Sequence, residues 1–279
     1  MKRQHIKATL SKAVMHVFLI ALLVVTLTPF LYIIMIAFGK NIVGTSATIP
    51  KEFTLENFQR LFVETKFINW IGNSLIIALT TMVIATVFVS ITVYVFSRLR
   101  FRGQAKLFQF ILLIQIFPLT LSMVSIFRIF VTLGILNDLK GLIIVNATIS
   151  SAGLVLLAKG YFDTIPYEID EAAMVDGASK FQTLVRVILP LAKPMLAVVA
   201  IQSFVIAYNE YAIASTVMTQ GLDTMPLAVG LQSMITGQYG TNWSMYCSAA
   251  LLGSIPMILL FYSLQKYFIG GLTEGSVKL

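Results

Sequence analysis

Long apolar runs, separated by short polar stretches, make up most of this sequence. A helix needs roughly 20 apolar residues to cross a bilayer core. Six runs are long enough, and they lie at residues 13–38, 71–96, 107 to about 124, 141–158, 195 to about 218, and 246–268. We expect Pro118 to kink the third run. The pattern predicts an all-α, polytopic membrane protein with six transmembrane helices, forming one transmembrane domain over residues 1–279.

Residues 125–140 do not fit this pattern cleanly. Apolar residues continue as far as Leu133, but Arg128 interrupts them, and Asn137 and Asp138 follow. Three interpretations stay open: the stretch spans the membrane, lies at its interface, or extends the third helix. The charge and the polar end favour an extension or an interfacial piece on the outer side.

The composition indicates the same class of protein. Hydrophobic residues make up 58% of the chain and charged residues only 11%, and the mean hydropathy is +0.88. A soluble globular protein of 279 residues is far less apolar than this. The first run, residues 13–38, is too long for the core of a signal peptide, and no A-x-A cleavage site follows it. We therefore expect it to remain as the first span.

The placement of Lys and Arg residues predicts the orientation. Fourteen of the 20 lie in the four regions that this topology puts inside the cell, and six lie outside. Such an inner excess follows the positive-inside rule and puts both termini in the cytoplasm. The net charge of +8 comes from these Lys and Arg residues, which we expect to lie near anionic lipid on the inner side. We therefore expect no nucleic-acid partner.

One polar stretch, residues 159–194, is too charged to lie in hydrocarbon. It holds five of the chain's twelve Asp and Glu residues and four Lys and Arg residues. Pro166 suits the first turn of a short helix, and Gly177 suits the left-handed residue that ends it. We name residues 159–194 the elbow.

A second short helix is expected to follow within the elbow. Ser179 and Gln182 have the spacing of a capping box. Apolar residues then recur on one helical face until Pro190 and Pro194 break the helix. The apolar positions are Phe181, Leu184, Val185 and Ile188.

The elbow carries a longer motif that resembles a known family. Glu171-Ala172-Ala173, Gly177 and Leu189-Pro190 match the EAA motif in the membrane subunits of ABC importers, with Val187 where the pattern prefers Ile. Shorter stretches are similar to the smaller permease subunit of maltose and maltodextrin importers. They are residues 96–101, 159–164, 194–210 and 270–278.

This resemblance implies a fold, a location and partners. The fold is the transmembrane domain of a type I ABC importer in the bacterial cytoplasmic (inner) membrane, importing an oligosaccharide such as maltodextrin. The implied partners are a second permease subunit in a heterodimer, two ABC ATPase subunits that bind ATP and Mg²⁺, an extracytoplasmic binding protein, and membrane lipid. The chain has no G-x-x-x-x-G-K-[ST] sequence to hold ATP itself.

The resemblance also implies that the elbow docks on the ATPase. The residues expected to couple the two proteins are Glu168, Glu171, Ala172, Ala173, Asp176, Gly177, Leu189 and Pro190. Small side chains at the two alanines suit close approach to a partner groove. Two simpler interpretations stay open: an amphipathic helix on the bilayer surface, and for Glu171 a stabilising interaction with the helix dipole alone.

A second candidate site follows the fifth run. Tyr208, Asn209, Glu210 and Tyr211 place polar and aromatic groups at the end of an apolar segment, which suits a sugar pathway because hydroxyls need hydrogen bonds and sugar faces pack on rings. Polar packing between helices is the alternative.

Two further segments have family precedents. The external loop, residues 219–244, is expected to reach the binding protein, with Gly237, Gln238, Tyr239 and Gly240 as candidate contacts. An ordinary packed loop is as good an interpretation. The tail, residues 270–279, either inserts between the ATPase subunits or is a frayed terminus.

Other functional classes are less well supported. An ion-coupled secondary transporter needs ionisable groups near the bilayer midplane, and Glu210 is the only good candidate. A membrane enzyme needs a convergent catalytic set, and the chain has no HExxH, G-x-S-x-G or His cluster. With one cysteine, Cys247, we expect no cysteine-based metal site, and we expect no catalytic or cofactor-binding residues in this chain.

Overall fold

The computed structural model describes residues 2–40, 49–116, 118–236 and 242–274, and in these ranges the regular elements are helices. The chain divides into two compact units. The first unit comprises Met1–Thr65 and Leu231–Gly253, and the second comprises Lys66–Gly230 and Ser254–Leu279. Helices α12 (Leu227–Thr236) and α13 (Trp243–Glu274) each contribute to both units.

Hydrogen bonds fasten the end of α1 (Lys2–Ala37) within the first unit. The side-chain amide of Asn57, on α2 (Glu56–Glu64), donates to the carbonyls of Ala37 at 2.9 Å and Gly39 at 2.8 Å. The hydroxyl of Ser248, on α13, donates to the same Ala37 carbonyl at 3.0 Å. The last carbonyls of a helix have no partner inside the helix, so these polar side chains satisfy the carbonyls at this end of α1.

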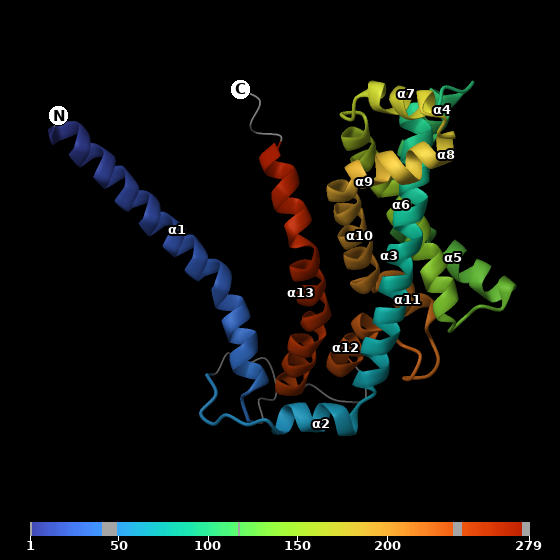
Figure 1. Ribbon diagram of the computed structural model, residues 1–279. Helices are drawn as coiled ribbons and strands as arrows, with labels where there is room; N and C mark the ends of the chain where they lie inside the picture. Colours follow the sequence, from blue (N-terminus) through green and yellow to red (C-terminus); the bar gives the residue numbers. More distant parts are fainter. Residues whose placement is uncertain (1, 41–48, 117, 237–241, 275–279) are drawn as a thin grey trace. The chain divides into compact units, whose positions relative to one another are not determined.

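Three long helices form the core of the second unit, where they pack side by side (Figure 1). They are α3 (Phe67–Arg98), α6 (Leu139–Phe162) and α10 (Lys193–Tyr208). The short helices of the elbow gather at one end of this bundle, and α11 (Ala212–Val217) lies at the other (Figure 1). The elbow helices are α7 (Tyr167–Val175), α8 (Lys180–Thr183), the π-helix η1 (Leu184–Ile188) and α9 (Leu189–Leu191).

Within the described ranges, five helical segments are long and apolar enough to cross a membrane. Each overlaps a predicted span, which confirms those five predictions. They are Lys12–Ala37, Phe67–Arg98, Leu139–Phe162, Lys193–Val217 and Trp243–Tyr267.

The prediction of one kinked third helix is wrong. The apolar run forms two helices, α4 (Gln104–Ile116) and α5 (Leu119–Leu133), inclined by 100°. Pro118 takes an extended conformation before α5, so the chain breaks here instead of bending within one helix. Counted as one span, the pair brings the total to six.

Residues 125–140, which the apolar pattern did not assign, are helical as far as Leu133. It extends α5, the helix that begins after Pro118, and Gly134 ends that helix in the left-handed conformation at φ 65°. Asp138 then caps α6 by accepting a hydrogen bond from the N–H of Lys140 at 2.9 Å. The polar residues that followed the apolar pattern therefore form the turn between two helices.

The expected break at Pro190 and Pro194 is also wrong. Helical conformation continues from α8 through η1 and α9 into α10, with one turn residue at Ala192. The wide π-turn precedes Pro190, and in it the N–H of Leu189 bonds to the carbonyl of Leu184. Because a π-turn changes the helical phase, the expected apolar face divides: Leu184 and Ile188 are buried, whereas Phe181 and Val185 are exposed.

The start of the external loop is tied to α3. The indole N–H of Trp70 donates to the carbonyl of Leu222 at 2.8 Å, and the amide of Asn73 donates to that of Asp223 at 2.8 Å. The hydroxyl of Ser74 accepts the N–H of Leu227 at 2.7 Å. This part of the loop is therefore an ordinary packed segment that is hydrogen-bonded to side chains of α3.

A close contact in this region predicts a packing defect. A Cβ atom added to Gly230 would lie 2.2 Å from the ring of Trp70, which is fully buried. Gly230→Ala should therefore lower the free energy of unfolding by about 1–3 kcal/mol, seen as a lower melting temperature in detergent. Gly153→Ala is the matched control, since nothing lies within 4 Å of its added Cβ. Equal melting temperatures for both variants would contradict the predicted clash.

Candidate functional site

The end of α7 is closed by a glycine, as the sequence predicted. Gly177 has φ 84°, which favours glycine. Its N–H bonds to the carbonyl of Met174 at 3.0 Å, and the N–H of Ala178 bonds to that of Ala173 at 3.0 Å. This pair of bonds is the Schellman motif, and it fixes the direction in which the chain leaves the helix.

The capping box at the start of α8 is confirmed. The N–H of Gln182 donates to the hydroxyl of Ser179 at 3.3 Å, and the N–H of Ser179 donates to the side chain of Gln182 at 2.8 Å. One residue, Ala178, separates this box from the glycine turn. The angle between the two elbow helices is therefore set by local hydrogen bonds on both sides.

The outer face of α7 carries most of the residues that were expected to couple to an ATPase. Glu168, Glu171 and Ala172 are exposed, as are Asp176 and Gly177 beyond the helix end. The same face ends in Val175, which is 87% exposed. An exposed apolar side chain therefore lies next to carboxylates here. Sequence reasoning missed Val175 because it occupies an unspecified position of the motif, between Ala173 and Gly177.

The other expected coupling residues lie elsewhere in the elbow. Ala173 is buried, whereas Ala172 is exposed, so the two alanines of the motif lie on different faces of α7. Leu189 is partly buried, and Pro190 is exposed after the π-turn. Ala173 therefore lies on the inner face of α7, and Leu189 and Pro190 lie in α9, away from the outer face of α7.

The inner face of α7 carries a buried carboxylate. Asp170 forms an ion pair with Arg98, the last residue of α3, with 2.9 Å between Oδ2 and Nε. Both side chains are almost fully buried, at 2% and 4% exposure. Despite the short distance, neither Asp170 oxygen accepts a hydrogen bond of good geometry from the described residues. Burial raises the pKa of Asp170, and the Arg98 guanidinium opposes that rise.

Sequence reasoning used Arg98 only to orient the chain and did not assign Asp170 a role. The available signal was the helical spacing. Asp170 and Ala173 are three residues apart and so share a face of α7, which differs from the exposed face that carries Glu171. An acid on the inner face of an amphipathic helix needs a buried partner.

The segment expected to form a sugar pathway is a break between two helices. α10 ends at Tyr208, and the carboxylate of Glu210 caps α11 by accepting the N–H groups of Ile213 at 2.6 Å and Ala214 at 2.9 Å. The Tyr208 ring is buried and stacks on Phe204, with centroids 5.4 Å apart.

The four side chains of this segment do not converge on one site. Asn209 is exposed, and its amide donates to the carbonyl of Val205 at 3.0 Å. The Tyr211 ring is 43% exposed. Asn209 and Tyr211 are therefore the exposed residues of this segment, whereas Glu210 accepts backbone hydrogen bonds at the start of α11.

The remaining expected contacts lie partly outside the described residues. Gly237, Gln238, Tyr239 and Gly240 all do, and so do residues 275–279 of the tail. The tail's first residues, 270–274, continue α13, which therefore runs beyond the predicted end of the sixth span.

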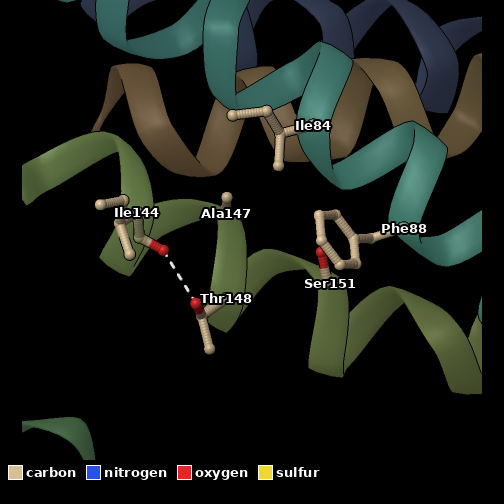
Figure 2. A pocket seen from close by; sticks show the side chains of 6 residues that line it. All are labelled: Ile84, Phe88, Ile144, Ala147, Thr148 and Ser151. Carbon is tan, nitrogen blue, oxygen red and sulfur yellow. Dashed lines mark hydrogen bonds between the residues drawn. The ribbon is translucent and has the colours of Figure 1, made fainter. Parts of the chain in front are cut away.

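A cavity of about 410 Å³ opens between α3 and α6 (Figure 2). Its lining is mostly apolar, and the hydroxyl of Thr148 donates to the carbonyl of Ile144 in its own helix at 2.8 Å. None of the described residues that line the cavity is titratable. The lining residues are Ile84, Phe88, Ile144, Ala147, Thr148 and Ser151.

Comparison with known proteins gives an end-to-end match. The family model for the binding-protein-dependent transport system inner membrane component matches residues 98–273. The maltodextrin transport system permease protein MdxG of Bacillus subtilis (strain 168) is 36% identical over 276 residues, covering 96% of this chain and 97% of that one. The galactooligosaccharides transport system permease protein GanQ of the same organism is 34% identical over 251 residues, covering 86% and 85%.

A solved structure shares the fold. It is the crystal structure of a bacterial ABC transporter involved in the import of the acidic polysaccharide alginate, and its matching chain superposes with a TM-score of 0.76. The match covers 92% of this chain and 95% of that one, at 24% sequence identity.

The cap formed by Glu210 generates a prediction. Glu210→Ala should lower the free energy of unfolding by about 1 kcal/mol because two N–H groups at the start of α11 lose their acceptor. Glu210→Gln should lose less, since its amide oxygen still accepts a hydrogen bond. Melting temperatures in detergent measure both effects, with Glu64→Ala as the control, because the exposed pair of Glu64 and Arg60 contributes little. Unchanged stability in Glu210→Ala, together with lost sugar transport, would contradict the structural role.

Proposed function

This chain belongs to the family of binding-protein-dependent transport system inner membrane components, and we propose that it is a permease subunit of an ATP-driven carbohydrate importer. It is a multi-pass protein of the cytoplasmic membrane. Hydrolysis of ATP, with its Mg²⁺, takes place on separate subunits, because this chain has no phosphate-binding loop. The observation that carries the proposal is the end-to-end similarity to oligosaccharide permeases, combined with the motif on the exposed face of α7.

The proposed substrate is an oligosaccharide. Relatives of this chain are named for the transport of maltodextrin and of galactooligosaccharides. The compounds in these names are both neutral, hydroxyl-rich chains of sugars, and they do not share one monosaccharide. Maltodextrin is the first compound to test, because the names of several matching permeases include it. Asn209 and Tyr211 offer the exposed amide and ring that such a substrate needs.

The outer face of α7 is the proposed docking surface for an ATPase subunit. Val175 and Met174 on α7, and Phe181 on α8, expose apolar side chains outside the spans. Apolar surface of this kind indicates a protein partner, and a small residue such as Ala172 permits close approach. Glu168 and Glu171 supply polar contacts at the rim. The two ATPase subunits would each receive one permease elbow, one of them from this chain.

The other proposed partners are a second permease subunit, which completes the translocation path as a heterodimer, and an extracytoplasmic binding protein. A structural neighbour supports the second partner: it is an alginate transporter in complex with a periplasmic protein bound to alginate pentasaccharide, with a TM-score of 0.66 at 14% identity. Here residues 237–240 of the external loop are the proposed contact, following the segment that is tied to α3.

An ion-coupled secondary transporter is the alternative. Its only good ionisable candidate was Glu210, and both carboxylate oxygens of Glu210 accept backbone N–H groups. A carboxylate fixed in this way is poorly placed to bind and release an ion during each transport cycle. The helix cap therefore favours the ATP-driven machine.

Transport by the purified complex tests the proposal. The tagged chain is purified with its associated proteins and placed in proteoliposomes with the binding protein and maltotriose or a galactooligosaccharide. We expect sugar uptake to require ATP, and one class of oligosaccharide to stimulate ATP hydrolysis. Uptake without ATP that is abolished by a protonophore would contradict the proposal and favour the secondary transporter.

A charge placed on the docking surface should prevent assembly. Val175→Glu is expected to reduce co-purification of the ATPase at least tenfold, because a carboxylate would be buried in the interface without a partner. Val63→Glu on α2 is the matched control, since that valine is 81% exposed and lies outside the elbow. Equal recovery of the ATPase with both variants would exclude this face as the docking surface.

Glu171 requires a separate test because two roles remain open for it. Glu171→Gln removes the charge but keeps the shape. If the carboxylate contacts the ATPase, ATP hydrolysis should become several-fold less sensitive to the sugar-loaded binding protein. Normal coupling in this variant would leave Glu171 with the role of stabilising the helix dipole, worth about 0.3–1 kcal/mol.

A further inference from the structure

Arg98 connects α3 to the elbow through three separate contacts. One guanidinium nitrogen, Nη2, donates to the carbonyl of Ile165 at 2.8 Å, and Nε lies 2.9 Å from the carboxylate of Asp170. The guanidinium carbon lies 4.8 Å from the centre of the Tyr167 ring. The flat, forked arginine head is therefore held on three sides by residues 165–170.

A fourth contact runs in the opposite direction. The hydroxyl of Tyr167 donates to the backbone carbonyl of Arg98 at 2.6 Å. That carbonyl belongs to the last residue of α3, so it lacks a partner within the helix. The end of α3 and the start of α7 thus satisfy each other's polar groups, and neither can move away without leaving buried groups unpaired.

The same face of α3 also holds the second elbow helix. Tyr94 lies four residues before Arg98 and is buried, and its hydroxyl donates to the carbonyl of Lys180 at 3.1 Å. Residues four apart project from one side of a helix. The last turn of α3 therefore bonds to both short helices of the elbow, to α7 through Arg98 and to the start of α8 through Tyr94.

These contacts matter because the backbone joins the elbow directly to α6 and α10 but not to α3. The elbow continues directly from α6 and into α10, so a movement of the elbow reaches those two helices through the backbone. Three helices, α4, α5 and α6, separate α3 from the elbow helices in the chain, so α3 has no such direct connection. Its link to the elbow consists of packing and of the contacts made by Tyr94 and Arg98.

The burial of the pair is also informative. Replacing a buried ion pair by apolar residues of similar size is often neutral or stabilising, so such a pair is weak evidence for a role in stability alone. What the buried arginine adds is a fixed geometry, because the planar guanidinium donates hydrogen bonds only in certain directions. Its bond to the Ile165 carbonyl, its ion pair with Asp170 and its contact with the Tyr167 ring together define where α7 sits on α3.

From these contacts, we infer that Arg98 is a positioning residue that clamps α7 to α3 through Asp170 and Tyr167. The inference rests on the proposed docking of the elbow to an ATPase. Movement of the docked elbow would then move α3 together with α6 and α10. Loss of the clamp leaves docking possible and removes the link between α7 and the end of α3, while the Tyr94 bond and the apolar packing of α3 against the elbow remain. ATP would then be hydrolysed with less sugar moved.

The test measures the ratio of maltotriose uptake to ATP hydrolysis in the complete complex, in proteoliposomes. The double variant Arg98→Met with Asp170→Leu removes the clamp and leaves no buried charge without a partner. We expect it to assemble with the ATPase in normal amounts, to melt at a similar temperature, and to show a ratio at least fivefold below that of the unmodified chain.

Two milder variants keep the charge and give the same readout if the double variant does not assemble. Arg98→Lys loses the fork, and Tyr167→Phe loses the hydrogen bond to the end of α3. Each should lower the ratio two- to threefold. The matched control is Arg60→Met with Glu64→Leu, which removes an exposed pair of the same chemistry on α2 and should leave the ratio unchanged.

The outcomes separate the two proposals. An unchanged ratio in the double variant, or in both milder variants when the double variant does not assemble, overturns the clamp and leaves the transport function standing. Uptake by the unmodified complex that ignores ATP overturns the proposed function, and the clamp falls with it. A lowered ratio with normal assembly and a normal melting temperature supports the clamp, because a purely structural role would change assembly and melting instead.

Discussion

One apolar cluster joins the elbow to the helical bundle, and the other features of the second unit depend on it. Ile165, Leu184 and Ile188 of the elbow are buried in the same cluster as side chains of α3, α6 and α10. Burying an aliphatic side chain contributes about 1.5–3 kcal/mol, so separating the elbow from the bundle would cost several such contacts. The bundle members of the cluster are Val89, Val93, Tyr94, Leu154, Val155, Ala158, Phe162, Met195 and Val199.

This packing gives two neighbouring acids of α7 different surroundings. Asp170 points inward and pairs with Arg98, whereas Glu171 points outward and is exposed. Successive residues of a helix are about 100° apart, so one short helix can hold the bundle on one face and present a partner surface on the other. In the proposed importer, the outward face receives the movement of the ATPase, and the inward face passes it to the spans.

The sequence was most informative where local rules decide the structure. Apolar runs predicted six spans, five of which match helical segments in the described ranges. Gly177 and the pair of Ser179 and Gln182 predicted the elbow's turns, because length, glycine geometry and capping depend on nearby residues. The break at Pro118 and the π-turn before Pro190 depend on tertiary packing, which decides whether a proline bends, stops or is accommodated in a helix. The contact between Arg98 and Asp170 joins residues far apart in the chain, and a single sequence does not reveal such a pairing.

The side of the membrane on which α7 lies, and whether a protein covers it, can be measured directly. A single cysteine at position 172, introduced by Ala172→Cys in a Cys247→Ala background, is treated with a membrane-impermeant maleimide in spheroplasts and in inside-out vesicles. We predict labelling in the vesicles only, and protection from labelling when the ATPase is bound. Labelling from the outer side, or equal labelling with and without the ATPase, would contradict the account of the elbow as the docking site.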